Sequence, residues 1–134
     1  MKILILSTFF AAILFLLIDI IWLSFAVKNF YRPNIGNLLL DKPVMWAAAL
    51  FYIIYVLGLA IVILEPAIKS EDYTKLIINA FVFGLVAYGT YNLTNMATIT
   101  GWSSKVVFVD MFWGGFLTAF SSYFGILIAK KLLL

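Results

Sequence analysis

Apolar residues fill four long stretches of the chain, and short polar segments separate them. The stretches run from Ile3 to Val27, from Val44 to Leu64, from Leu76 to about Thr98, and from Val106 to Ala129. A helix of about 20 residues crosses a hydrocarbon core of about 30 Å, so each stretch is long enough to span a membrane. None shows the ten-residue alternation of a barrel strand. We therefore predict four transmembrane helices.

Polar breaks that contain proline mark the expected helix ends. The first loop is predicted between Arg32-Pro33-Asn34 and Asp41-Lys42-Pro43, and Glu65-Pro66 is predicted to close the second helix. A solvated turn is expected at Lys69-Ser70-Glu71-Asp72. No connection is long enough for another domain, so residues 1–134 are expected to form one transmembrane domain. The predicted fold class is all-α, an integral membrane protein with four helices in an up-down bundle.

The composition agrees with this class and excludes several chemistries. Apolar residues make up 66% and charged residues 11% of the chain, unlike a soluble domain. The chain has no Cys and no His, which excludes disulfides, haem or iron–sulfur ligation by the usual side chains, and Ser-His or Cys-His nucleophiles. No cofactor and no metal is expected, because the Asp and Asn residues lack the spacing of a Mg²⁺ or Ca²⁺ site.

The net charge of +3 comes from single Lys and Arg residues at segment ends. That distribution fits anionic headgroups and not nucleic acid, so we expect membrane lipids as partners. Five of these residues lie on the side of the termini and four on the other side. The positive-inside rule then favours cytoplasmic termini, in a bacterial inner membrane.

Two aspartates fall within the predicted spans, both toward the face that carries the first and third loops. At about 1.5 Å per residue, Asp19 lies about 13 Å in from Lys28, and Asp110 lies about 7 Å in from Lys105. A charged Asp at mid-membrane costs about 2.5 to 3.5 kcal/mol, so such a residue is a site hypothesis by default. Two structural alternatives stay open: Asp19 could hold helices together by a hydrogen bond, and Asp110 could cap its helix in the headgroup layer.

Polar side chains from every span fall at a similar depth. The third span carries them at i, i+3, i+4 and i+7, which places them on one face. Each Asp is followed three residues later by a Trp whose indole N–H needs an acceptor, and the neighbouring Asp is the expected one. We predict a one-sided polar pocket formed by Asp19, Trp22, Tyr52, Tyr55, Tyr88, Tyr91, Asn92, Asn95, Asp110 and Trp113.

Other aromatic and small residues have simpler interpretations. Tyr31, Trp46, Tyr73 and Trp102 lie at segment ends and are interpreted as interfacial belt residues. Small residues recur on the fourth span, as in Gly115-x-x-x-Ala119, at a spacing that lets helices approach closely. We interpret these small residues as packing positions.

These residues resemble a family of bacterial inner-membrane proteins known as domain of unknown function twenty-one seventy-seven. The resemblance covers nearly the whole chain and is most specific in the block from Gly84 to Ala97, followed by Trp102 and by Asp110-Met111-Phe112-Trp113-Gly114. It implies a four-helix membrane protein of unassigned activity. Family members often carry Asp where this chain has Asn92, which puts a three-acid mechanism in doubt. Members tend to be encoded near lipid-modifying methyltransferase-like genes, which is an association only.

Three functions fit the sequence. The first is a binding or accessory protein whose pocket holds a small polar or amphipathic ligand such as a lipid headgroup. The second is a proton-coupled small-molecule transporter, by architectural analogy with small multidrug transporters; in that case we expect a homodimer. The third is a lipid-modifying enzyme with the carboxyls as acid and base, although no nucleophile, metal or cofactor motif supports it.

Overall fold

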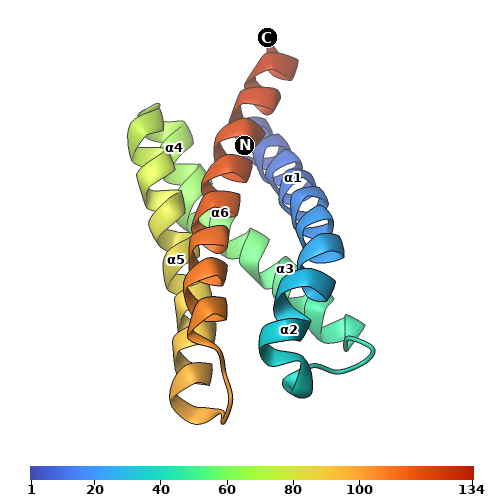
Figure 1. The fold of residues 1–134 in the computed structure, drawn as a ribbon. Coiled ribbons are helices and arrows are strands. Elements are labelled where there is room, and N and C mark those ends of the chain that lie inside the picture. Colours follow the sequence, from blue (N-terminus) through green and yellow to red (C-terminus); the bar gives the residue numbers. More distant parts are fainter.

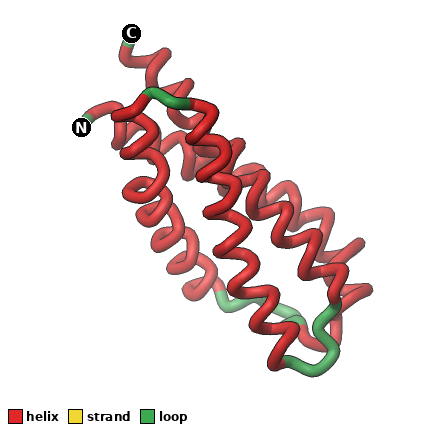
Figure 2. Tube along the Cα trace, turned by 90° about the vertical axis from the view of Figure 1, so that its left-hand side faces the viewer, coloured by secondary structure: helices red, strands yellow, loops and turns green.

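The computed structural model describes residues 1–134, which form helices joined by short turns. Four helical spans are long and apolar enough to cross a membrane: Lys2–Leu38, Met45–Ser70, Tyr73–Thr98 and Ser104–Leu133. Both termini lie at one end of the molecule, and the first and third loops lie at the other end (Figures 1 and 2). The predicted up-down bundle of four transmembrane helices is therefore confirmed.

Helix α6 (Ser104–Leu133) is the central element of the bundle. It packs along α5 (Tyr73–Thr98) on one side and along α1 (Lys2–Ala26) on the other, and these two interfaces supply most contacts between helices. Helix α3 (Met45–Leu59) crosses behind α6 at a slant and packs only briefly against α1 (Figure 1). The slant takes the N-terminal half of α3 toward α2 and away from α5.

Small residues set the close approach of these helices, as their spacing predicts. A Cβ atom on Gly84 of α5 would lie 2.2 Å from the carbonyl oxygen of Gly114 on α6. A Cβ atom on Gly125 would meet the backbone of α1 at Ser7 and Ala11. Because helices in lipid associate largely through packing, these glycines determine how closely α6 can fit between its neighbours.

The first two spans do not end where their prolines predict. The first continues from α1 through a π-helical turn at Val27–Tyr31, α2 (Arg32–Ile35) and a 3₁₀ turn at Gly36–Leu38. The second continues from α3 through a π-helical turn at Ala60–Leu64 and α4 (Glu65–Ser70). The predicted stops at Arg32-Pro33-Asn34 and Glu65-Pro66 are therefore wrong.

The π-helical turns explain how each helix tolerates its proline. Proline lacks an amide hydrogen, and its ring collides with the carbonyl four residues earlier in an α-helix. In both spans a π turn of five residues ends two residues before the proline. Each turn closes with a hydrogen bond to the carbonyl five residues earlier, from the Arg32 amide to the Val27 oxygen and from the Glu65 amide to the Ala60 oxygen. The wider turn shifts the local bonding pattern, so the chain stays helical past Pro33 and Pro66.

The turn between α4 and α5 lies at the end of the bundle that also carries both termini. Glu71 adopts a left-handed conformation there, with φ of 56°. The Asp72 side chain then caps α5 by accepting a hydrogen bond from the Lys75 amide at 2.9 Å. Lys130 near the end of α6 reaches Glu71 at 2.8 Å, which ties the C-terminal end of α6 to this turn.

Candidate functional site

Asp19 is buried on α1, with 6% of its surface exposed, and binds two other helices. The hydroxyl of Tyr52 on α3 donates to its Oδ2 atom at 2.5 Å, and the indole Nε1 of Trp113 on α6 donates to its Oδ1 atom at 3.1 Å. Both carboxyl oxygens thus have partners, and the side chain joins three helices. This geometry matches the interhelical hydrogen bond that the sequence left open for Asp19.

Asp110 is buried on α6, with 7% of its surface exposed. Its Oδ1 atom accepts a hydrogen bond from the Tyr31 hydroxyl, and its Oδ2 atom accepts one from the Asn92 amide at 2.6 Å. The alternative in which Asp110 caps its helix is wrong, because α6 begins at Ser104 and Asp110 lies inside the helix against α5 and the end of the first span. The depth of about 7 Å that the sequence gives for Asp110 is compatible with a helix cap and with a position inside the span.

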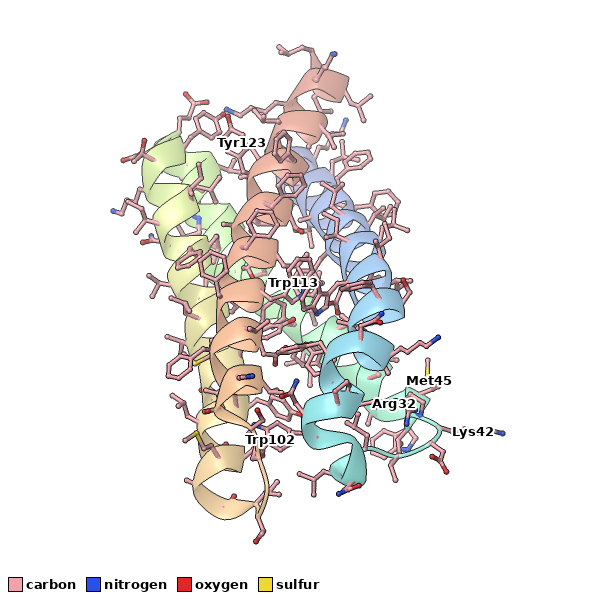
Figure 3. The ribbon with its side chains drawn as sticks, in the orientation of Figure 1. Arg32, Lys42, Met45, Trp102, Trp113 and Tyr123 are labelled. Atoms are coloured by element: carbon pink, nitrogen blue, oxygen red, sulfur yellow. The ribbon has the colours of Figure 1, made fainter.

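Two stacked indole rings connect the surroundings of the two acids. The rings of Trp22 and Trp113 lie 4.6 Å apart with 20° between their planes, and Figure 3 shows Trp113 between α6 and α1. Trp22 donates its N–H to the Tyr31 oxygen at 3.2 Å, and Tyr31 in turn donates to Asp110. The prediction that each indole binds the Asp three residues before it is wrong. Trp22 binds Tyr31 and Trp113 reaches across to Asp19 on α1, because both rings lie between the helices.

Asp110 lines two cavities on the side of the first and third loops. The larger has a volume of about 400 Å³ and lies between the end of the first span, the first loop, α5 and α6; its wall includes Tyr31, Arg32, Asp41 and Trp102. The smaller has a volume of about 290 Å³ and is lined by Phe51, Ala87, Tyr88, Tyr91 and Asp110. Tyr91 and Asp110 belong to both walls, so the two cavities meet at this pair.

Two buried polar atoms near Asp110 lack a hydrogen-bond partner. The Oδ1 atom of Asn92 and the Nε1 atom of Trp102 are both buried and have no hydrogen-bond partner. Trp102 packs edge-on against Tyr91, with ring centres 5.6 Å apart, in the wall of the larger cavity. An unpaired buried donor costs free energy, so the Trp102 N–H is an unsatisfied polar group in the structure.

The two buried acids have no cationic partner. The ion pairs in the structure are Lys69 with Glu65 and Lys130 with Glu71, both at the opposite end of the bundle. The structure has no cluster of three or more His, Cys, Asp or Glu side chains that could hold a metal ion. Asp19 and Asp110 are therefore surrounded by hydroxyl, indole and amide donors, without a positive charge in contact.

A comparison with protein families matches residues 4–127 to the family described as "Predicted membrane protein (DUF2177)". The chain belongs to this family. Membership in DUF2177 confirms the resemblance found in the sequence motifs and agrees with the four helical spans. Comparisons with curated proteins and with solved structures gave no match.

The structure gathers most of the predicted pocket residues in this DUF2177 member, but not all. Asp19, Trp22, Tyr52 and Trp113 form hydrogen bonds or stacking contacts around the first acid, and Tyr88, Tyr91 and Asn92 surround the second. Tyr55 makes no hydrogen bond to either acid; its hydroxyl shares one with Thr118 at 2.6 Å, and its ring packs edge-on against Tyr88 with centres 6.4 Å apart. Asn95 is half-buried, lines neither cavity and makes no side-chain hydrogen bond with the protein.

Tyr31 is the principal residue that the sequence interpretation missed. It was placed in an interfacial belt because Arg32-Pro33 was expected to end the helix. In a straight α-helix, nine residues would turn Tyr31 about 180° away from Trp22. The π-helical turn at Val27–Tyr31 shifts the register by about one residue, which brings the Tyr31 hydroxyl to Trp22 and Asp110.

Arg32, Phe51 and Trp102 were also absent from the predicted pocket, and each lines a cavity. Figure 3 shows Trp102 and Arg32 at the end of the first and third loops, which is the open end of this region. Arg32 and Trp102 lie in segments that the sequence assigns to loops. No local pattern distinguishes them from ordinary interfacial residues.

Proposed function

We propose that this protein is a membrane-embedded binding protein whose loop-side cavities hold a small amphipathic ligand of the lipid class. The observation that carries the proposal is the position of Asp110, a buried carboxyl without a cationic partner that lines both cavities. In a membrane, an ionisable side chain inside a helical bundle marks a functional site more often than a packing position. A ligand at this carboxyl would contact the two cavities at once.

The walls of the larger cavity support an amphipathic ligand. Nine of its 13 lining residues are hydrophobic, and the remaining groups include Arg32 and Asp41 toward the loops and Asp110 inside. Known ligand sites combine apolar walls with a few polar groups that fix orientation. A polar head between Arg32 and Asp110, with an apolar part along the helices, fits this distribution.

The test compares two isosteric variants, Asp110→Asn and Asp19→Asn. The protein is extracted in mild detergent, and co-purifying small molecules are identified by mass spectrometry. We expect the parent and Asp19→Asn to retain the same molecule and Asp110→Asn to lose most of it, because Asp110 lines both cavities and Asp19 lines neither. Val27→Phe, which adds volume to the wall of the larger cavity, should also reduce retention. Equal retention by all four proteins would contradict the proposal.

A second candidate is proton-coupled transport, which the pair of buried carboxyls favours. Asp19 and Asp110 belong to one set of aromatic and hydrogen-bonded contacts without a neutralising cation. Proton binding and release at such groups is a common element of transporters. Reconstituted protein would show substrate-driven proton flux that Asp19→Asn abolishes. Equal flux from Asp19→Asn and the parent would remove Asp19 from the coupling mechanism.

We also propose that the protein lies in a bacterial inner membrane with both termini in the cytoplasm. The number of Lys and Arg residues at each end supports this orientation. The chain has no Cys, so single cysteines at Asn37 and at Ser70 can report the two sides without further changes. In intact cells, a membrane-impermeant maleimide should label Asn37→Cys and not Ser70→Cys. The reverse pattern would establish the opposite orientation.

A further inference from the structure

The smaller cavity has an unusual lining for a site within a membrane bundle. Its wall combines three aromatic residues, one alanine and one carboxyl: Phe51, Tyr88, Tyr91, Ala87 and Asp110. We call this set the Asp110 cage. The aromatic residues come from α3 and α5, and the carboxyl comes from α6, so three helices line a half-open cavity of about 290 Å³.

The carboxyl is the only charged group in this cage. Asp110 accepts hydrogen bonds from two uncharged donors. These are the Tyr31 hydroxyl at the end of the first span and the Asn92 amide on α5. Of the charged groups in the adjoining cavity, Arg32 and Asp41 have opposite signs and are both exposed toward the loops. No cation within 4 Å pairs with Asp110. The protein therefore places no cation against the one ionisable carboxyl of the cage.

The aromatic residues add a second preference for positive charge. The faces of Phe and Tyr rings are negative, and rings arranged around a carboxyl form the kind of cage that binds quaternary ammonium groups. The hydroxyls of Tyr88 and Tyr91 make no hydrogen bond to another protein group. An anion would be repelled by Asp110, and an uncharged molecule would leave the carboxyl without a counter-ion in a medium of low polarity.

We propose that the Asp110 cage is a binding site for small organic ammonium ions that carry an apolar substituent. The ammonium group would lie against Asp110 and the aromatic rings, and the substituent would follow the apolar walls of the cavities. This inference rests on the proposed binding function and adds the charge and chemical class of the ligand. It concerns recognition only and requires no change in the covalent structure of the ligand.

The experiment measures binding of three probes to the full-length protein in nanodiscs by titration calorimetry, with empty nanodiscs as the blank. The probes are hexyltrimethylammonium, its uncharged analogue with carbon in place of nitrogen, and hexyl sulfate. We expect the ammonium probe to bind at least about tenfold more tightly than either of the others, because only it pairs with the carboxyl and the rings. In Asp110→Asn the preference should fall several-fold, because only the aromatic rings still favour the cation.

Two further variants keep the test decisive if Asp110→Asn does not fold. Ala87→Leu fills the cage and leaves both acids with their donors, so it should abolish ammonium binding. Phe51→Leu keeps an apolar wall but removes one ring, so it should weaken the ammonium probe several-fold. Phe112→Leu is the matched control, because Phe112 is an exposed α6 residue outside both cavities.

The outcomes separate this inference from the proposed function. If all three probes bind equally and Ala87→Leu blocks them, the cavities hold amphiphiles without regard to charge, and only the ammonium assignment is overturned. If no probe binds and no small molecule co-purifies, the binding function itself is overturned. Ammonium binding that Ala87→Leu leaves unchanged would place the ion elsewhere and also overturn the inference.

Discussion

Single hydroxyl and amide groups organise the two buried acids. Tyr31 holds a central position, since its oxygen accepts from Trp22 while its hydrogen goes to Asp110. A phenylalanine at this position would keep the ring and lose both bonds. Buried acids in this arrangement depend on neutral donors, so the removal of one donor leaves a polar atom unpaired inside the bundle.

Tyr31→Phe should therefore lower the free energy of unfolding by about 1 to 2 kcal/mol, within the range measured for hydrogen bonds in membrane proteins. The measurement is denaturant-induced unfolding in mixed micelles. Tyr123→Phe serves as the control, because Tyr123 is half-buried, lies near the opposite end of α6 and makes no side-chain hydrogen bond in the structure. Equal stability of Tyr31→Phe and the parent would show that the network contributes no net stability.

Glycine at position 84 is required by the distance between α5 and α6. An alanine Cβ atom would lie 2.2 Å from a backbone oxygen of Gly114, and backbone cannot move aside as a side chain can. We expect Gly84→Ala to separate the helices and to lower the free energy of unfolding by about 1 to 3 kcal/mol. The same unfolding assay on Gly58→Ala is the control, since its nearest neighbour lies at an ordinary 3.6 Å. Comparable losses from both variants would contradict this account.

At the scale of elements, the two π-helical turns let long helices contain proline. Each turn of five residues ends two residues before the proline, in Lys2–Leu38 and again in Met45–Ser70. The turns do more than avoid a collision. In the first span the shift of register points Tyr31 at Asp110, so the same turn that accommodates Pro33 also completes the site.

Since the π turn has already accommodated the proline ring, Pro66→Ala should change the free energy of unfolding by less than about 1 kcal/mol. Ile53→Pro, at an exposed α3 position without a π turn before it, should cost about 3 kcal/mol or more. Thermal unfolding followed by circular dichroism compares the two. A loss from Pro66→Ala as large as that from Ile53→Pro would mean that the proline itself stabilises the turn.

At the scale of the whole molecule, charge is divided between the two ends. The end with the termini has paired charges, including Lys130 with Glu71 at 2.8 Å. The hydrogen bond and the positive charge of Lys130 lower the pKa of Glu71 below its ordinary value of 4.5. The other end has no ion pair and contains the two cavities beside Asp110. This asymmetry is consistent with ion pairs that hold the helices together at one end and with the proposed ligand site at the other end.

The lowered pKa of Glu71 implies a pH dependence with a definite sign. A carboxyl whose pKa is lower in the folded state contributes stability above its unfolded pKa, and this contribution is lost as the pH falls through the folded pKa. The contribution is small because both groups are exposed. A carboxyl titration by nuclear magnetic resonance should give a Glu71 midpoint below 4.5 in the parent and a higher one in Lys130→Gln. The same midpoint in both proteins would contradict the ion pair in solution.

The sequence by itself determines the class, the number of spans and the level at which the acids lie. Runs of apolar residues of membrane-spanning length leave few alternatives to helices, and opposite helix directions place Asp19 and Asp110 toward one face. Spacing on α5 also predicts one polar face that points inward, and on this face Tyr88 and Asn92 lie beside Gly114 and Asp110 of α6. These features are local or follow from chain direction, so they can be derived without coordinates.

Only the tertiary structure decides which donor reaches which acid. The rotation of a helix about its axis depends on π turns and on contacts with its neighbours, and neither has a clear pattern in the sequence. For this reason Tyr31 was assigned to the membrane interface, although it binds Asp110. Trp113 was likewise expected to bind Asp110, although it binds Asp19. The smaller cavity likewise depends on the tertiary structure, because its wall combines residues of α3, α5 and α6 that are far apart in the sequence.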